Sequence, residues 1–311
     1  MKLGMFGLGK MGANMALRLI RGGHKVVGWS RSESTVNEAR EQGVKPATND
    51  LEEAVAQLEP PRVLWLMIPS GWPVDNMIER LLPLTDDGDI FIDGGNSRYT
   101  DSVRRGEELA AKGYHFVDVG TSGGVWGLEE GYSMMIGGEE EVVGRLRPLF
   151  EILSPGTQIG WAHMGPVGAG HFVKMVHNGI EYGMMQAYAE GFALMKRKEQ
   201  FNLDLHQIAK TWRHGSVVRS WLLDLIVRGL KSEGQDLDHI APWVHDSGEG
   251  RWTVEEAIET ATNLPVITTA LMQRFASRDE DQYANRLLAV MRNQFGGHSV
   301  RQAEGDGDGD D

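Results

Sequence analysis

Four polar side chains within residues 170–182 have the types and spacing of an acid–base site. Lys174, His177, Asn178 and Glu181 lie three, four and seven positions apart, so a helix would place them on one side. A lysine can remove a hydroxyl proton if burial or nearby positive charge lowers its pKa, and a glutamate can supply a proton. In isolation, such a run is more often a solvated helix face stabilised by charge pairs. The rest of the chain decides between these interpretations.

A glycine-rich motif stands near the start of the chain. Residues 2–6 predict a strand, and a helix over residues 11–21 with a second strand over residues 25–29 completes a strand–helix–strand unit. Glycines permit a tight turn and let backbone N–H groups approach a pyrophosphate at a helix N-terminus. This context predicts a dinucleotide site; the alternative is a turn that only packs a helix on a strand. The motif Gly-x-Gly-x-x-Gly consists of Gly7, Leu8, Gly9, Lys10, Met11 and Gly12.

The residues after the second strand predict which dinucleotide binds. An acidic side chain there would bind the adenosine ribose and repel a 2′-phosphate. This chain has Ser30, Arg31 and Ser32 instead. Because a guanidinium binds phosphate through charged, forked hydrogen bonds, Arg31 favours NADP over NAD as the cofactor.

Composition restricts the class of protein. The chain has 311 residues, of which 41% are hydrophobic, with a formal net charge of −13 and no cysteine. The lack of cysteine excludes disulfides and thiolate metal sites, and the acidic balance argues against a nucleic-acid partner. No apolar run is long enough to span a bilayer, and a strand that begins at residue 2 leaves no room for a signal peptide. We therefore expect a cytoplasmic enzyme without a metal and without a membrane partner.

The first half of the chain alternates apolar strands with helical segments, which predicts a parallel sheet with crossover helices. Ligands bind beyond the carboxyl ends of such strands, so the small and polar segments at residues 69–70, 94–97 and 120–124 are candidate site loops. The other expected strands cover residues 63–68, 90–93 and 115–119, and the other expected helices cover residues 34–41, 50–58, 74–82 and 102–112.

From about residue 165 the pattern changes to long amphipathic helices. The expected organisation is an α/β Rossmann-type domain with a parallel sheet over residues 1–163, then an all-α substrate-binding and dimerisation domain over residues 164–303. Residues 304–311 alternate glycine with aspartate, but they lack the later ligands of a calcium loop, so we expect a disordered acidic tail. The expected helices of the second domain cover residues 168–198, 203–212, 216–230, 253–262 and 265–294.

Several strings behind the dinucleotide motif resemble a known family. Residues 93–97 (DGGNS), 120–127 (GTSGGVWG) and 170–182 occur in the order found in 6-phosphogluconate dehydrogenases, the decarboxylating enzymes of the pentose phosphate pathway. This family belongs to the β-hydroxyacid dehydrogenase superfamily. Residues 250–253 (GRWT) and 292–298 (RNQFGGH) resemble further substrate-side segments. In the family, a lysine is common at the position of Arg251. The chain resembles the short form, which lacks a duplicated helical domain and often uses NAD.

The resemblance implies a reaction, a homodimer or higher homo-oligomer, and roles for individual residues. Its substrate would be 6-phospho-D-gluconate, a phosphorylated sugar acid, and its products D-ribulose 5-phosphate and CO2. Lys174 would take the hydroxyl proton and later return a proton, and Glu181 would protonate the carbon that had carried the carboxylate. The segment with Arg292 and His298 would come from the partner subunit. The implied substrate-binding residues are Asn96, Ser122, Gly123, Gly124, His177, Asn178, Tyr182, Arg251, Arg278, Arg292 and His298, and Ile68, Pro69 and Asn96 would also contact the cofactor.

Two other classes stay open at this stage. A β-hydroxyacid dehydrogenase or imine reductase would keep the dinucleotide site and lose the phosphate ligands and the decarboxylation. Arg251, Arg292 and His298, together with Glu181, distinguish the decarboxylating family from these enzymes. A non-catalytic nucleotide sensor would need no paired acid and base.

Overall fold

The computed structural model describes residues 1–296 and 299–301 and divides into two compact units. Unit 1 comprises Met1–Met184 and Gly248–Ile267, and unit 2 comprises Met185–Ser247 and Thr268–Asp311. The last strand ends at Gly165, close to the expected domain boundary, but contacts group the following residues up to Met184 with the sheet. The boundary near residue 164 therefore remains a prediction. The expected disordered tail lies outside the described residues.

Unit 1 is built on an eight-stranded sheet. Its strands are β1 (Lys2–Phe6), β2 (Lys25–Trp29), β3 (Ala47–Thr48), β4 (Val63–Leu66), β5 (Ile90–Asp93), β6 (His115–Ser122), β7 (Ser133–Gly137) and β8 (Trp161–Gly165). The spatial order is β3-β2-β1-β4-β5-β6-β7-β8. The first six strands pair in parallel, and parallel pairing was expected for the five of them other than β3. Because the chain order reverses between β1 and β4, the carboxyl ends of these two strands border the crevice where such sheets bind ligands.

Three strands were not expected from the sequence. β3 has only two residues, and β7 pairs antiparallel with β6, so the sheet is parallel in most but not all of its strands. The side chains of β8 are largely exposed or half-buried, because this strand lies at the edge of the sheet. An exposed edge strand has no regular apolar pattern, and its pairing with β7 becomes visible only in the fold.

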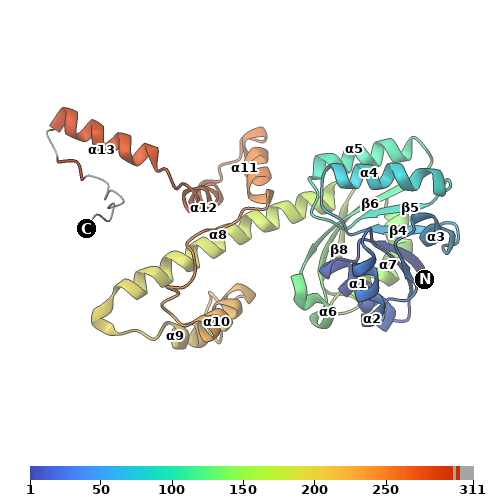
Figure 1. The fold of residues 1–311 in the computed structure, drawn as a ribbon, viewed down its shortest axis with the longest axis horizontal. Helices are drawn as coiled ribbons and strands as arrows, with labels where there is room; N and C mark the ends of the chain where they lie inside the picture. The colour runs from blue at the N-terminus through green and yellow to red at the C-terminus, as the bar shows by residue number, and fades with distance from the viewer. Residues whose placement is uncertain (297–298, 302–311) are drawn as a thin grey trace, which may run out of the picture. The chain divides into compact units, whose positions relative to one another are not determined.

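Helices cover both faces of the sheet, with α4 and α5 on one side and α1 and α2 on the other (Figure 1). Successive side chains of β4 show the division, since Trp65 joins the buried cluster of α1, α2 and α7, whereas Leu64 and Leu66 join that of α3 and α4. Burial on both faces explains why the central strands are almost continuously apolar. The helices of unit 1 are α1 (Lys10–Arg21), α2 (Glu33–Gln42), α3 (Leu51–Ala56), α4 (Trp72–Leu81), α5 (Tyr99–Ala110), α6 (Gly127–Glu130), α7 (Glu140–Leu153) and α11 (Glu249–Glu259), with 3₁₀ turns η1 (Leu82–Leu84) and η2 (Gly124–Trp126).

Helices are the only regular secondary structure among the described residues of unit 2, as expected. Its small core consists of Ala209, Leu223 and Val227, with Tyr188 and Phe192 packed against them. Two helices have residues in both units, namely α8 (Ala169–Arg197) and α12 (Pro265–Ala276). The elements that lie in unit 2 only are α9 (Leu205–Trp212), α10 (Trp221–Glu233), α13 (Tyr283–Gly296) and the 3₁₀ turn η3 (Glu199–Phe201).

The expected continuous helix over residues 265–294 is wrong, because the chain leaves the helical path between α12 and α13. The Ser277 hydroxyl donates to the Arg274 carbonyl at 2.8 Å, and the Asp279 carboxylate accepts from the Gln282 N–H at 2.9 Å. Gln282 has a φ of 48°, in the left-handed region. Short polar side chains that bond to nearby backbone groups compete with helical hydrogen bonds and so break the helix here.

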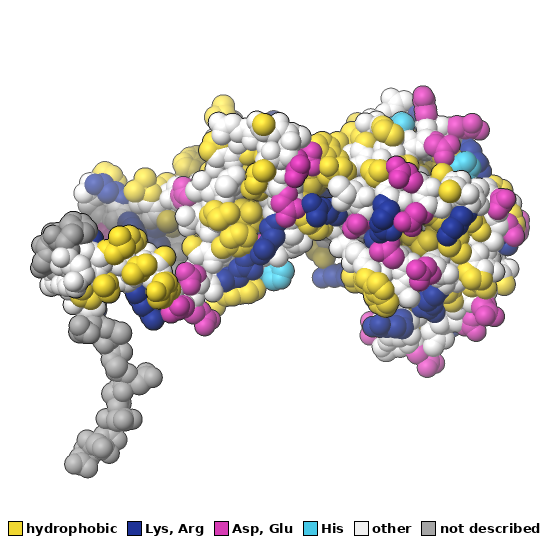
Figure 2. Space-filling model, turned by 90° about the horizontal axis from the view of Figure 1, so that it is seen from above, with side chains coloured by type: hydrophobic (Ala, Val, Ile, Leu, Met, Phe, Trp, Pro, Cys, Tyr) yellow, Lys and Arg dark blue, Asp and Glu magenta, His cyan; other side chains and the backbone are white. Residues whose placement is uncertain are grey.

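The surface carries intermixed charges. Figure 2 shows acidic and basic side chains interspersed on the visible face of unit 1, so the excess negative charge does not form a patch there. Within the described part of the chain, no helix is both long enough and apolar enough to cross a membrane.

Candidate active site

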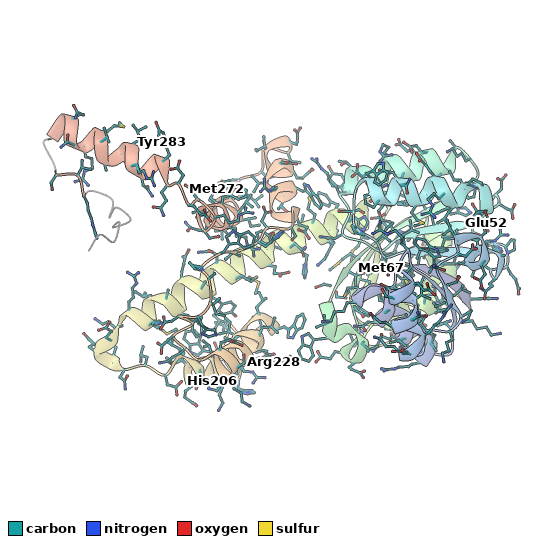
Figure 3. All side chains as sticks on the ribbon, in the orientation of Figure 1. Glu52, Met67, His206, Arg228, Met272 and Tyr283 are labelled. Carbon is teal, nitrogen blue, oxygen red and sulfur yellow. The ribbon has the colours of Figure 1, made fainter. Side chains whose placement is uncertain are left out.

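The three glycines of the N-terminal motif are required, or tolerated, for different structural reasons. Gly7 has a φ of +111°, and a Cβ there would collide with the carbonyl of Met67, which is labelled in Figure 3. A Cβ on Gly12 would collide with the Gly7 carbonyl, whereas one on Gly9 would meet nothing within 4 Å. Gly7 thus allows the loop to pass close to the end of β4, Gly12 allows α1 to pack against that loop, and Gly9 leaves open space at the α1 N-terminus. This arrangement fits a pyrophosphate, held by backbone N–H groups and the helix dipole.

The other residues of this motif differ in exposure. The Leu8 side chain is buried in the core, so only its backbone faces the loop. Met11 is half-buried, and Lys10 is exposed at the start of α1. A role for Lys10 in cofactor binding stays a prediction.

The loop after β2 leaves a cation free. Ser30 donates its N–H to the Thr48 carbonyl at 3.2 Å, and the Ser32 hydroxyl lies 2.7 Å from that of Ser34 at the start of α2. Arg31 is exposed, and no hydrogen bond or ion pair with the described residues engages its guanidinium. The geometry is thus compatible with a 2′-phosphate ligand, and the preference for NADP stays a prediction.

A buried arginine joins the loops after β4 and β5. The Arg105 guanidinium is only 1% exposed and donates to the Gly71 carbonyl at 3.0 Å, to Asp75 at 2.8 Å and to Asp93 at 3.3 Å. The Arg104 and Arg105 guanidiniums hold the pKa of Asp75 below its ordinary value, although burial acts in the opposite direction. This network fixes the ends of two neighbouring strands at the edge where ligands bind.

Asp93 shapes the loop that carries Asn96. Its carboxylate accepts from the Gly95 N–H at 3.1 Å and from the Ser97 hydroxyl at 2.7 Å. Asn96 is exposed between these two anchored residues. Ile68 and Pro69, expected at the cofactor, lie just beyond β4 and are half-buried and exposed, respectively.

A buried carboxylate seats the start of α8 on the sheet. Asp118 of β6 is fully buried and accepts from the N–H groups of Gly168 at 2.6 Å and His171 at 2.7 Å. A Cβ on Gly170 would collide with backbone of β6 and β7, and one on Gly120 would collide with the Lys174 side chain. The first turns of α8 therefore pack directly on β6 and place Lys174 beside this strand.

His171 ties the same helix to the loop after β5. Its Nε2 lies 3.1 Å from the Gly95 carbonyl, and its Nδ1 lies 2.7 Å from the Ser102 hydroxyl. Because a carbonyl only accepts, Nε2 carries the proton and Nδ1 accepts from Ser102. The loop with Asn96 is thereby held against the turn of α8 that precedes Lys174.

Lys174 lies at the centre of the polar group on α8. The residue is 8% exposed, and its Nζ donates to Asn178 Oδ1 at 2.7 Å. His177 Nδ1 lies 3.5 Å from Nζ and 3.0 Å from the same amide oxygen. Burial lowers the pKa of Lys174 from its ordinary value, and the carboxylates of Glu181 and Glu249 act in the opposite direction. A buried lysine with a lowered pKa suits a general base and is not part of a solvated helix face.

The helix α11 brings a second carboxylate to this group. Glu249 is 3% exposed and accepts from Asn178 Nδ2 at 3.1 Å and also from Asn96 Nδ2. Tyr182, at 4% exposure, packs closely against Gly250. The sequence offered one signal for Glu249, namely its position directly before the GRWT string. Its burial and its amide partners depend on the packing of α11 against α8, which no local pattern reveals.

The other expected substrate ligands fall into three groups. Ser122 is the last residue of β6, and Gly123 and Gly124 follow it directly. They lie a few residues beyond Gly120, the β6 position next to Lys174, and the two glycines have φ values of 128° and 53°. Glu181 is half-buried on α8, and Arg251 is exposed on α11.

The third group consists of Arg278 and Arg292, which belong to unit 2, and His298. The Arg278 guanidinium donates to the buried Asp246 carboxylate at 3.3 Å, and Arg292 is exposed on α13. His298 lies outside the described residues. The phosphate-binding roles of these three residues remain predictions.

A glycine-rich nucleotide loop at the switch point of a mostly parallel sheet, with a buried lysine on the next long helix, defines a Rossmann-type dehydrogenase with a helical C-terminal domain. The NAD-binding domain of 6-phosphogluconate dehydrogenase matches residues 2–165, and the C-terminal domain of 6-phosphogluconate dehydrogenase matches residues 170–306. The chain belongs to the 6-phosphogluconate dehydrogenase family, which confirms the resemblance seen in its motifs.

Individual relatives support this assignment. The chain is 42% identical to YqeC of Bacillus subtilis over 302 residues, which cover 97% of this chain and all of that protein. It is 41% identical over 304 residues to the NAD(+)-dependent, decarboxylating 6-phosphogluconate dehydrogenase of Haloferax volcanii, covering 98% of this chain and all of the relative. The structure of Plasmodium falciparum 6-phosphogluconate dehydrogenase superimposes with a TM-score of 0.82 at 29% identity and covers 98% of this chain and 67% of that chain. The two full-length matches are consistent with a short form of the family.

Proposed function

We propose that this chain catalyses the oxidative decarboxylation of 6-phospho-D-gluconate to D-ribulose 5-phosphate and CO2, with reduction of NADP or NAD. The observation that carries the proposal is the buried Lys174 amino group, which is hydrogen-bonded to Asn178 and lies beside the end of β6. A relative that shares 41% identity over its whole length is named for this activity.

The chemistry starts with Lys174 as a neutral amine that takes the proton of the substrate 3-hydroxyl. The open space at Gly9 and the α1 N-terminus would hold the pyrophosphate of NAD(P), whose nicotinamide would supply the hydride acceptor. The resulting 3-keto acid loses its carboxylate as CO2, and the electron pair moves to the carbonyl oxygen. Lys174, now charged, returns its proton to that oxygen. Glu181 then protonates the carbon that had carried the carboxylate, and the neutral Lys174 amine takes back the O–H proton, so that the carbonyl of ribulose 5-phosphate forms.

The substrate ligands follow from the same arrangement. Asn96, His177, Asn178 and Tyr182 contact or border the polar group around Lys174 and would orient the hydroxyls. Ser122, Gly123 and Gly124 would hold the carboxylate, and Arg251, Arg278, Arg292 and His298 would bind the phosphate. We further propose a cytoplasmic homodimer, in which the segment with Arg292 and His298 completes the site of the partner subunit.

Replacing Glu181 with Gln should impair product formation after hydride transfer. Without a proton donor at the released carbon, an enediol or keto species should accumulate, and the steady-state rate should fall by about 10²- to 10⁴-fold. Acid quenching of a single turnover, followed by mass spectrometry of the sugar phosphates, measures the accumulation. An unchanged rate without trapped species would refute the role of Glu181.

Replacing Arg31 with Ala should weaken NADP binding and leave NAD binding nearly unchanged. A charged hydrogen bond contributes about 1.5 to 3 kcal/mol, and the free guanidinium of Arg31 is suited to the 2′-phosphate. Titration of the variant and the unmodified protein with both dinucleotides measures the difference. The Haloferax relative is NAD(+)-dependent, so a preference for NAD in the unmodified protein would show that Arg31 serves another purpose.

A direct assay tests the proposed function. The purified protein should reduce NADP or NAD in the presence of 6-phosphogluconate and should not do so with 3-hydroxyisobutyrate or with gluconate that lacks the phosphate. Turnover of the unphosphorylated hydroxyacid without CO2 would instead identify a β-hydroxyacid dehydrogenase. Nucleotide binding without any turnover would identify a sensor.

A further inference from the structure

We propose that Glu249 is a positioning residue of the active site, which orients the amides of Asn96 and Asn178 so that both present their carbonyl oxygens to proton donors. This role rests on the proposed function and adds a second carboxylate to the site, beside Glu181.

The amide of Asn178 lies between Lys174 and the Glu249 carboxylate. Lys174 Nζ donates to its Oδ1 at 2.7 Å, and its Nδ2 donates to Glu249 Oε1 at 3.1 Å. The reversed amide would turn its oxygen toward the carboxylate, which is repulsive, and would turn its NH2 group toward Lys174, which is repulsive when the lysine is charged. Glu249 thus fixes one end of the amide whose other end holds the catalytic lysine.

The amide of Asn96 is held by the same carboxylate oxygen. Its Nδ2 donates to Glu249 Oε1, so its Oδ1 is turned away from the carboxylate. Asn96 is exposed, and no hydrogen bond from the described residues reaches this oxygen. A hydroxyl of the substrate is a donor that fits this acceptor. Glu249 Oε1 therefore accepts from both amides, Asn96 in the loop after β5 and Asn178 on α8, and aligns them with each other.

Glu249 is itself held in place. It follows Gly248, which has a φ of +105°, and opens α11, whose N-terminus favours a negative charge. The Thr253 hydroxyl lies 3.0 Å from the Met175 carbonyl on α8 and 2.8 Å from the Glu249 carbonyl. Because α11 is anchored to α8 one turn from the carboxylate, a buried Glu249 side chain keeps its position relative to Asn178.

The charge of Glu249 also acts on Lys174. The titratable groups that act on or contact Lys174 are His177 and Glu181 on α8 and Glu249 on α11. The Asp118 carboxylate of β6, which packs against the same helix, is bound to the N–H groups of Gly168 and His171. Burial lowers the pKa of Lys174, and the negative charge of Glu249 opposes that effect. Removing this charge should therefore move the pKa of Lys174 further down, which a merely structural residue would not do.

The experiment compares Glu249→Gln, Glu249→Asp and a matched control, Glu255→Gln, on the same helix. Glu255 is about half exposed and forms an ion pair with Arg98, away from Lys174. For each protein, kcat and KM for 6-phosphogluconate are measured as a function of pH, together with nucleotide affinity and thermal unfolding. The rate at which trinitrobenzenesulfonate modifies Lys174 is followed by mass spectrometry over the same pH range, because it reports the neutral amine without any turnover.

Glu249→Gln should lower kcat/KM about 100-fold with unchanged nucleotide affinity, as expected when substrate and base are misplaced. In this variant, the acid limb of the plot of kcat/KM against pH and the pH profile of Lys174 modification should both shift to lower pH. Glu249→Asp keeps the charge, so both profiles should stay near those of the unmodified protein while kcat/KM falls. Glu255→Gln should behave like the unmodified protein in every measurement.

Wild-type kcat/KM in a folded Glu249→Gln variant, or a Lys174 profile that does not shift, would overturn the proposal. If Glu249→Gln fails to fold, Glu249→Asp tests the proposal. Its shorter side chain should not reach both amides, so an unchanged kcat/KM in this variant would contradict the positioning role. If the unmodified protein does not turn over 6-phosphogluconate, the proposed function fails, and the modification profiles still determine whether Glu249 acts on Lys174.

Discussion

Replacing Lys174 with Met should lower kcat/KM for 6-phosphogluconate by about 10²- to 10⁴-fold, the usual contribution of a general acid–base group. Methionine has a similar length and no proton to transfer, so it removes the base and keeps most of the packing in the buried site. Nucleotide affinity should change little, because the glycine loop at the α1 N-terminus has its own contacts.

Lys174→Arg provides a sharper comparison, because an arginine keeps the positive charge and cannot act as a base near neutral pH. We expect it to be nearly as impaired as Lys174→Met. Lys112→Met, at an exposed position of unit 1, is the matched control and should retain full activity. Near-normal turnover in Lys174→Met would exclude Lys174 as the base, and near-normal turnover in Lys174→Arg would reduce its role to electrostatic stabilisation.

Mixing two inactive variants should restore activity if the site is shared between subunits. Lys174→Met removes the base, and Arg292→Ala removes a proposed phosphate ligand on α13, so each homodimer should be inactive. Random reassociation makes about half of the dimers hybrids with one intact site each, so about a quarter of the unmodified activity should return. The measurement is the initial rate after the two proteins are unfolded together, refolded and verified as mixed dimers.

A second mixture serves as the control. Lys174 and Glu181 lie on the same helix of the same chain, so Lys174→Met mixed with Glu181→Gln leaves a defect in every hybrid site. No activity should return there. If the mixture with Arg292→Ala also stays inactive although mixed dimers are present, or if a monomer is fully active, the shared site is contradicted.

Local patterns predicted five of the eight strands of the nucleotide-binding half of the fold and the helices α1 to α5 that connect them. The glycine motif, the strands around it and the helix that carries Lys174 depend on neighbours in the sequence, and the structure confirms them within a few residues. The spacing from Lys174 to Asn178 likewise predicted a contact that the structure contains. These features follow from helical and strand periodicity, which the sequence expresses directly.

Features that depend on distant pairing were not predicted. β7 and β8 are recognisable only through their partners in the sheet. The break between α12 and α13 was missed for another reason, because it depends on local bonds of short polar side chains that the apolar periodicity does not express. Asp118 and Glu249 are ordinary acidic residues in the sequence. Their roles come from burial against α8 and from N–H donors that the fold brings to them.

The most direct test of the account uses 6-phosphogluconate labelled with ¹³C at its carboxylate carbon. We predict that the unmodified protein releases one labelled CO2 for each NADPH or NADH formed and that the ribulose 5-phosphate carries no label. Reduction of the dinucleotide without labelled CO2, or no reduction with either dinucleotide, would contradict the proposed oxidative decarboxylation.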